Sequence, residues 1–127
     1  MNGLRQEAMI REPQVREVNA NNLLGLEVST VATGSIDLYP GQHPMVLSLT
    51  TNRSGAISVG LNTAGARRKD RARIVSNQAS PGAFAITVKT GTAAGGTSIG
   101  TISSSKNGFL EAQFDGTNWV FVGKSEY

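Results

Sequence analysis

Short runs in which apolar and polar residues alternate recur from Ser35 to the end of the chain, and this pattern limits the possible folds most strongly. Successive side chains of a β-strand point to opposite faces, so each run has one side for a core and one for solvent. Weaker strands are expected over residues 72–77 and 97–103. The inward positions of the strong runs are Ile36, Leu38, Met45, Leu47, Leu49, Ile57, Val59, Leu61, Phe84, Ile86, Val88, Leu110, Ala112, Phe114, Trp119 and Phe121.

Turn residues separate these runs. Asp115-Gly116 lies between two alternating runs, where glycine tolerates the positive φ that a tight hairpin requires. Pro-Gly pairs at 40–41 and 81–82 mark two further turns. A faint repeat aligns residues 55–59 with residues 82–86, at an offset of 27 residues. The sequence therefore predicts an all-β fold, a compact antiparallel β-sandwich or barrel of about eight short strands.

Residues 1–33 differ in composition from the rest of the chain. Of the 15 glycines of the chain, this segment holds only Gly3 and Gly25, and Pro13 would stop a short helix that begins near Leu4. Three asparagines then precede an apolar cluster that has no long periodic frame. The segment is too apolar for a free linker and too irregular for a domain. We therefore expect an extended N-terminal arm over residues 1–33 and a β domain over residues 34–127.

Several kinds of chemistry have no candidate residues here. The chain has no cysteine and one histidine, His43, which lies between turn residues. No phosphate-binding loop, metal-ligand pattern or nucleophile motif is present. We therefore expect no enzyme activity, no catalytic residues, no cofactor and no metal site. The sequence also has no apolar stretch long enough for a membrane span or a secretory signal, so no membrane partner is expected.

Positive charge is concentrated between Arg67 and Arg73, where RRKDRAR carries five cations and one acid. Three interpretations are open. The block is a solvated loop, a docking patch for an acidic protein surface, or a contact with nucleic acid. No aromatic side chain lies inside the block to stack on bases, so a nucleic-acid partner is not expected.

The closing stretch, residues 109–123, reads FLEAQFDGTNWVFVG. It resembles a closing hairpin of small β domains in the virions of tailed bacteriophages, among them capsid decoration (cement) proteins and head or tail fibre domains. In that group a strand ending in an aromatic residue leads through Asp-Gly-Thr-Asn-Trp into a final apolar strand. The resemblance implies a virion structural protein, often a homotrimer, made in the host cytoplasm. The chain has no repetitive shaft, and a compact domain with one arm suits decoration better than a fibre.

We therefore expect a capsid decoration protein that binds the major capsid protein on the outer surface of the capsid and stabilises the shell. Two alternatives stay open: a head or tail fibre domain that binds a receptor or adaptor, and a carbohydrate-binding module centred on Trp119. The residues expected to contact the capsid are the apolar positions of the arm and the cations of the basic block. They are Leu4, Ile10, Leu23, Leu24, Leu26, Arg67, Arg68, Lys69, Arg71 and Arg73.

Overall fold

The computed structural model describes residues 25–127, and within them the alternating runs form nine strands. The strands are β2 (Leu26–Ser29), β3 (Gly34–Leu38), β4 (Val46–Leu49), β5 (Ile57–Leu61), β6 (Arg71–Ser76), β7 (Ile86–Thr90), β8 (Thr97–Ile102), β9 (Gly108–Phe114) and β10 (Trp119–Glu126). No helix occurs in this part of the chain. The all-β prediction is confirmed, and every predicted run overlaps a strand.

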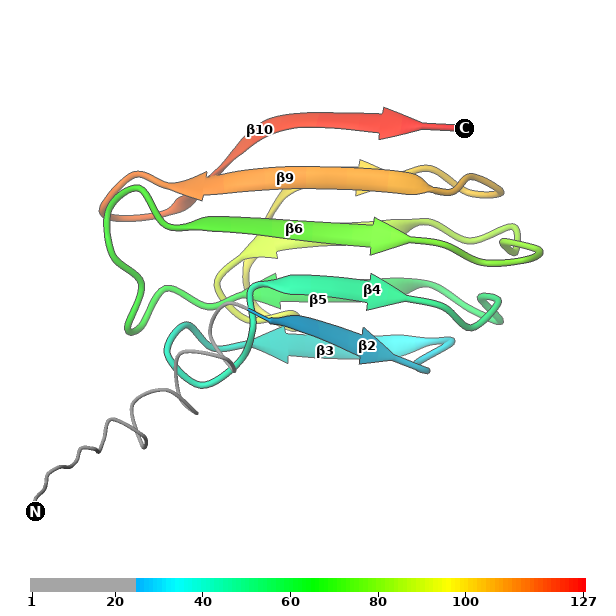
Figure 1. Cartoon of the computed structure of the whole chain (residues 1–127), viewed down its shortest axis with the longest axis horizontal. Coiled ribbons are helices and arrows are strands. Elements are labelled where there is room, and N and C mark those ends of the chain that lie inside the picture. Colours follow the sequence, from blue (N-terminus) through cyan, green and yellow to red (C-terminus); the bar gives the residue numbers. More distant parts are fainter. Residues whose placement is uncertain (1–24) are drawn as a thin grey trace, which may run out of the picture.

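Two sheets are stacked face to face in a sandwich-like arrangement. The five-stranded sheet has the order β10-β9-β6-β4-β2, which Figure 1 shows from top to bottom. The four-stranded sheet has the order β3-β5-β7-β8. From β2 to β7 the chain changes sheet at every connection, so these six strands wind as three turns of a flattened roll. The last three strands then close the roll.

The predicted antiparallel pairing is wrong for this roll. β2 with β4, β4 with β6, β3 with β5 and β5 with β7 are all parallel pairs. Within the described residues, the antiparallel pairs are β7 with β8, β6 with β9 and β9 with β10. The physical reason is the connectivity. Consecutive strands lie in opposite sheets, so the chain returns to the first sheet only after a full turn. The returning strand then runs in the same direction as the strand it pairs with.

Register also corrects the predicted repeat. Ile57 of β5 pairs with Ile86 of β7, so equivalent positions of these strands are 29 residues apart rather than 27. The predicted arm contains a strand as well, because β2 pairs with β4 and joins the five-stranded sheet as its edge. Residues 1–24 of the predicted arm lie outside the described residues.

The core is made by the inward positions of both sheets. Its fully buried members include Leu47 and Leu49 of β4 and all three predicted positions of β5. Trp119 is 1% exposed, its ring lies 5.4 Å from that of Phe114, and its indole N–H donates to the carbonyl of Asn62 at 3.0 Å. A buried ring with a satisfied N–H contributes packing rather than a surface for a sugar. The Trp119-centred carbohydrate-binding module is therefore not supported.

The closing hairpin is built as its sequence predicts. Gly116 has φ +107°, and Asp115 Oδ1 accepts the backbone N–H groups of Thr117 and Asn118, both at 2.8 Å. These bonds hold the pKa of Asp115 below its ordinary value, and the charge of Arg68 acts in the same direction. The carboxylate therefore serves the turn, which leads β9 into β10.

One cation is used inside the structure. Arg53 is buried, and its guanidinium donates to Gln78 Oε1 at 3.1 Å, to the carbonyl of Phe84 at 2.8 Å and to the carbonyl of Lys106. Burial lowers the pKa of Arg53 because these partners are neutral acceptors that do not replace the water lost around the charge. Arg53 thus ties together three loops at the end of the sandwich where β4 ends and β9 begins.

Candidate docking surface

The basic block that the sequence singled out is divided between a turn and a strand. Arg67, Arg68 and Lys69 lie in the connection between β5 and β6, whereas Arg71 and Arg73 lie on β6 itself. Ala72 and Ile74 alternate with these two arginines and point inward, so both arginines project from the outer face of the five-stranded sheet. The block therefore extends from one end of the sheet onto its surface.

Backbone hydrogen bonds fix the turn against the closing hairpin. Asp70 closes it, because Asp70 Oδ2 accepts the N–H of Arg67 at 2.8 Å and the N–H of Asp70 donates back to the Arg67 carbonyl at 2.9 Å. Lys69 has φ +78°, and its N–H donates to the carbonyl of Phe114 at 2.9 Å. The N–H of Phe114 donates to the carbonyl of Asp70 at 2.8 Å. The three cations of the turn are thus presented from a fixed backbone.

The register of the five strands shows which side chains share the outer face with the arginines. Two rows run across the whole sheet, and a third, shorter row crosses β6, β9 and β10. The rows are Leu26–Val46–Arg73–Glu111–Gly123, then Val28–Ser48–Val75–Phe109–Ser125, then Arg71–Gln113–Val120. We call this surface the five-stranded outer face. It combines apolar side chains with cations.

The apolar side chains of this face are strongly exposed at both of its edges. Leu26 and Val28 on β2 are 55% and 59% exposed, and Val120 and Val122 on β10 are 46% and 47% exposed. Val122 stands at a register irregularity between Phe121 and Gly123, where β10 has one residue without a partner on β9. Such a bulge changes the direction of a side chain relative to a regular strand.

Charge on the five-stranded outer face is only partly neutralised. Arg73 Nε lies 3.1 Å from Glu111 Oε2, and the guanidinium covers the ring of Phe109 at 4.1 Å. The carboxylate of Glu111 on β9 is therefore the ion-pair partner of Arg73. The other four cations of the block make no ion pair with a described residue; they are Arg67, Arg68, Lys69 and Arg71.

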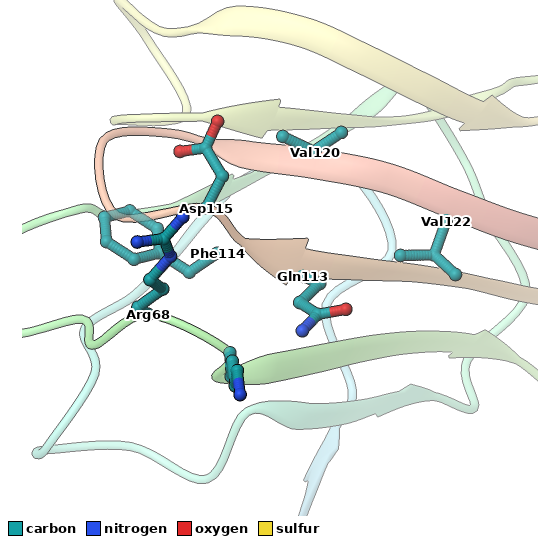
Figure 2. A pocket seen from close by; sticks show the side chains of 7 residues that line it. Arg68, Gln113, Phe114, Asp115, Val120 and Val122 are labelled. Atoms are coloured by element: carbon teal, nitrogen blue, oxygen red, sulfur yellow. The ribbon is translucent and has the colours of Figure 1, made fainter.

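Two hollows flank Lys69 where the turn meets this face. The first, of about 490 Å³, is lined by Val120 and Val122 of β10, Gln113, Phe114 and Asp115 of the hairpin, and the two cations Arg68 and Lys69. Figure 2 shows the two valines along β10, Gln113 beside them on β9, and Arg68 next to Phe114 and Asp115. The second hollow, of about 660 Å³, is lined by Pro40, Gly41, Met45, Val46, Arg67, Lys69, Asp70 and Arg71.

The outer face of the other sheet has a different composition. One of its rows consists only of hydroxyl side chains, Ser35–Ser58–Thr87–Thr101. Its second row, Asp37–Gly60–Lys89–Ser98, lies beneath the loop between β7 and β8. Ala93 of that loop is 1% exposed; its N–H donates to Asp37 Oδ1 at 2.7 Å, and its carbonyl accepts from Lys89 Nζ at 2.9 Å. This glycine-rich segment is therefore fastened over Gly60.

The residues predicted to bind the capsid are thus partly brought together. Leu26 lies on the same face as Arg71 and Arg73, and the three cations of the turn lie at one end of that face. Sequence reasoning did not single out Val46, Val120 or Val122 as surface contacts, although the last two belong to the run Val-Phe-Val that follows Trp119. Leu4, Ile10, Leu23 and Leu24 lie outside the described residues.

Residues 25–127 hold no second kind of candidate site. No cluster of His, Asp or Glu in this range has the grouping of a metal site. No helix long and apolar enough to cross a membrane occurs there either. His43 takes part in a turn, where Nδ1 accepts the N–H of Tyr39 at 3.0 Å. Comparison of the chain with protein-family models, curated proteins and solved structures finds no match.

Proposed function

We propose that this protein is a non-enzymatic decoration protein of a bacteriophage capsid. Its five-stranded outer face binds the outer capsid surface, and the added contacts stabilise the shell. The observation that carries the proposal is the composition of that face, on which exposed apolar side chains surround cations that have no partner within the described residues. Exposed apolar side chains that lie beside polar and charged ones on one face are typical of an interaction site. The resemblance of residues 109–123 to phage virion domains supplies the class of partner.

The mechanism requires only binding. Each Å² of apolar surface removed from water contributes about 25 cal/mol, and the costs of association reduce that gain. A homotrimer offsets these costs, because the second and third subunits bind at a high effective concentration once the first has docked. Bound subunits that bridge neighbouring capsid proteins then oppose their separation. The free protein is accordingly expected to be a trimer, which analytical ultracentrifugation measures.

The cations of the basic block determine which region of the partner is preferred and how fast the two proteins associate. They favour an acidic region of the major capsid protein, raise the rate of association and exclude basic surfaces. Exposed charges more than about 10 Å apart are largely screened at 0.1 M ionic strength, so the association rate is expected to fall as salt rises. Apolar contacts are less affected by salt and determine how long the protein stays bound.

The proposal is tested by co-sedimentation of the full chain with capsids assembled without it. Arg71→Glu reverses a charge at the start of the central strand of the face. We expect about a hundredfold weaker binding, since like charges brought together at an interface cost several kcal/mol. Ser35→Glu is the matched control, because it adds the same carboxylate to an exposed position of the four-stranded sheet. It is expected to leave binding unchanged.

Two results would overturn the proposal. One is no binding of the unaltered protein to capsids, with retention on head or tail fibres or on host cells. The other is equal weakening by Arg71→Glu and Ser35→Glu, which would remove the five-stranded outer face from the interface. Circular dichroism melting of each variant shows that the comparison is made between folded proteins.

A further inference from the structure

The two hollows beside Lys69 are neighbours at the turn end of the five-stranded outer face, and Lys69 belongs to the lining of both. Val120 and Val122 line only the first, and Met45 and Val46 line only the second. Between these apolar ends lie Lys69, Arg71 and the amide of Gln113. We call the two hollows together the trough. It has an apolar end on β10, a cationic centre and an apolar end on β4.

From this arrangement we infer that the trough binds one short extended segment of the partner with the pattern apolar–any–acidic–any–apolar. The inference rests on the proposed function and specifies its partner chemistry. An acidic side chain at the centre meets Lys69 and Arg71, and the two apolar side chains enter the hollows at the ends. The segment lies across the strands, over the sheet face, and not along the edge of β10.

The dimensions of the trough support this spacing. From β10 across β9 and β6 to β4 there are three strand intervals of about 4.8 Å, or about 14 Å in all. An extended chain advances about 3.3 Å per residue, so its first and fifth residues are about 13 Å apart. Side chains one, three and five of an extended segment also project from the same side. All three recognition elements of the pattern therefore face the trough together.

Charge complementarity favours an acid at the centre over any other group. Arg71 and Lys69 have no ion-pair partner among the described residues. The linings of the two hollows hold four cations and two carboxylates, Asp70 and Asp115, so positive charge is in excess. Asp70 Oδ2 accepts the Arg67 N–H, and Asp115 Oδ1 accepts two N–H groups of its own turn. A carboxylate from a partner satisfies cations that residues 25–127 leave without an ion pair.

The inference is tested with a synthetic peptide, acetyl-Leu-Thr-Glu-Thr-Leu-amide, titrated into the ¹⁵N-labelled full chain. We expect the backbone amides of Lys69, Arg71 and Gln113 to shift. The matched control peptide, acetyl-Thr-Leu-Glu-Leu-Thr-amide, has the same composition but carries its leucines on the side opposite the glutamate. It is expected to bind at least tenfold more weakly. Equal affinity of the two peptides, or shifts confined to other strands, would overturn the inference.

A variant of the trough provides the second arm. Lys69→Gly removes the central cation, and glycine adopts the positive φ of this position readily, so the fold is kept. We expect about tenfold weaker binding of the first peptide. Lys106→Ala, a cation removed at the opposite end of β9, serves as the control and is expected to have no effect. Equal effects of the two substitutions would contradict a central role for Lys69.

The outcomes separate this inference from the proposed function. If the protein binds capsids and Arg71→Glu weakens that binding, yet neither peptide binds the protein, the docking function stands and the trough hypothesis is wrong. If the first peptide binds with the expected preference but capsids do not, the trough recognises an acidic segment of another partner and the capsid function is wrong.

Discussion

The outer faces of the two sheets differ in how far loops of the described chain cover them. The four-stranded sheet is covered over part of its surface by its own chain, because the loop between β7 and β8 buries Ala93 above Gly60 and fastens it to Asp37 and Lys89. The remaining row of that face carries only hydroxyl side chains. The five-stranded sheet has no such cover in residues 25–127, although it carries the larger share of exposed apolar side chains.

This difference is the reason for placing the proposed partner on the five-stranded outer face. Covering apolar surface with a loop of the same domain stabilises the fold, and water forms hydrogen bonds to a row of hydroxyl groups. The half-exposed leucine and valine side chains of the five-stranded outer face are neither buried by a loop nor able to form hydrogen bonds with water. Under the proposed function, a second protein supplies contacts on the face that residues 25–127 leave uncovered.

The largest expected effect on stability tests the covered face. A Cβ at position 60 would lie 2.3 Å from the backbone nitrogen of Ala93 and 2.6 Å from Asp37 Oδ1. Gly60→Ala therefore pushes the loop away, and overpacking of this kind costs on the order of 1–3 kcal/mol. For a domain of this size, each kcal/mol lowers Tm by about 4–8 °C.

Gly123→Ala provides the matched control on the other face, because nothing lies within 4 Å of a Cβ at position 123. Its melting temperature is expected to stay near that of the unaltered protein. Differential scanning calorimetry measures both variants. Equal melting temperatures for the two would show that the loop does not cover the four-stranded sheet as described.

A smaller effect is expected from the apolar edge of the uncovered face. Leu26→Ser leaves the core intact because this side chain is already 55% exposed, so melting should hardly change. Capsid binding is expected to weaken about tenfold, since completing the burial of a half-exposed leucine contributes on the order of 1 kcal/mol. Thr87→Ala, on the hydroxyl row of the other sheet, is the control. Unchanged co-sedimentation of Leu26→Ser would exclude β2 from the interface.

The sequence predicts strand positions well and strand neighbours poorly. Alternation reports which side chains of one strand are buried, as the fully buried Ile57, Val59 and Leu61 show. It is wrong for Phe84 and Phe121, which were predicted to point inward but are 41% and 42% exposed. It does not report which sheet the next strand joins, so alternation alone suggests antiparallel neighbours where the chain forms three turns of a parallel roll. β2 escapes prediction for a related reason: Leu26 and Val28 point outward, opposite to the usual pattern of an edge strand.

The candidate site is predictable in part on equally local grounds. A cluster of cations in the sequence remains a cluster in space, so the basic block is found. Its division is also encoded, because Arg71 and Arg73 alternate with Ala72 and Ile74 and therefore share the outward side of a strand. The trough is not predictable, since its lining comes from β4, β6, β9 and β10 and from the loops at residues 40–41 and 67–70. Only the folded sheet brings Val46 of β4 and the valines of β10 to its opposite ends.

The smallest expected effect concerns the contact between β10 of the five-stranded sheet and Ser103, which follows β8 of the four-stranded sheet. We call this contact the seam. Glu126 of β10 accepts the N–H of Ser103 at 2.7 Å and its hydroxyl at 3.1 Å, and Lys124 Nζ lies 3.2 Å from the same carboxylate. These contacts, led by the backbone hydrogen bond, lower the pKa of Glu126. A lowered folded pKa adds stability that is complete above the ordinary glutamate pKa of about 4.3 and is lost as pH falls through the lower folded value.

Glu126→Gln keeps an acceptor for Ser103 but removes the charge, so it should lower stability slightly at pH 7 and not at all in strong acid. The loss is expected to be smaller than that of Gly60→Ala, because the carboxylate is near solvent and its charge is screened. Urea unfolding of both proteins from pH 7 down to pH 2 measures the difference. The two curves should converge as pH falls. A constant difference across this range would assign the effect to packing at the seam, and the charge of Glu126 would then have no part in joining the sheets.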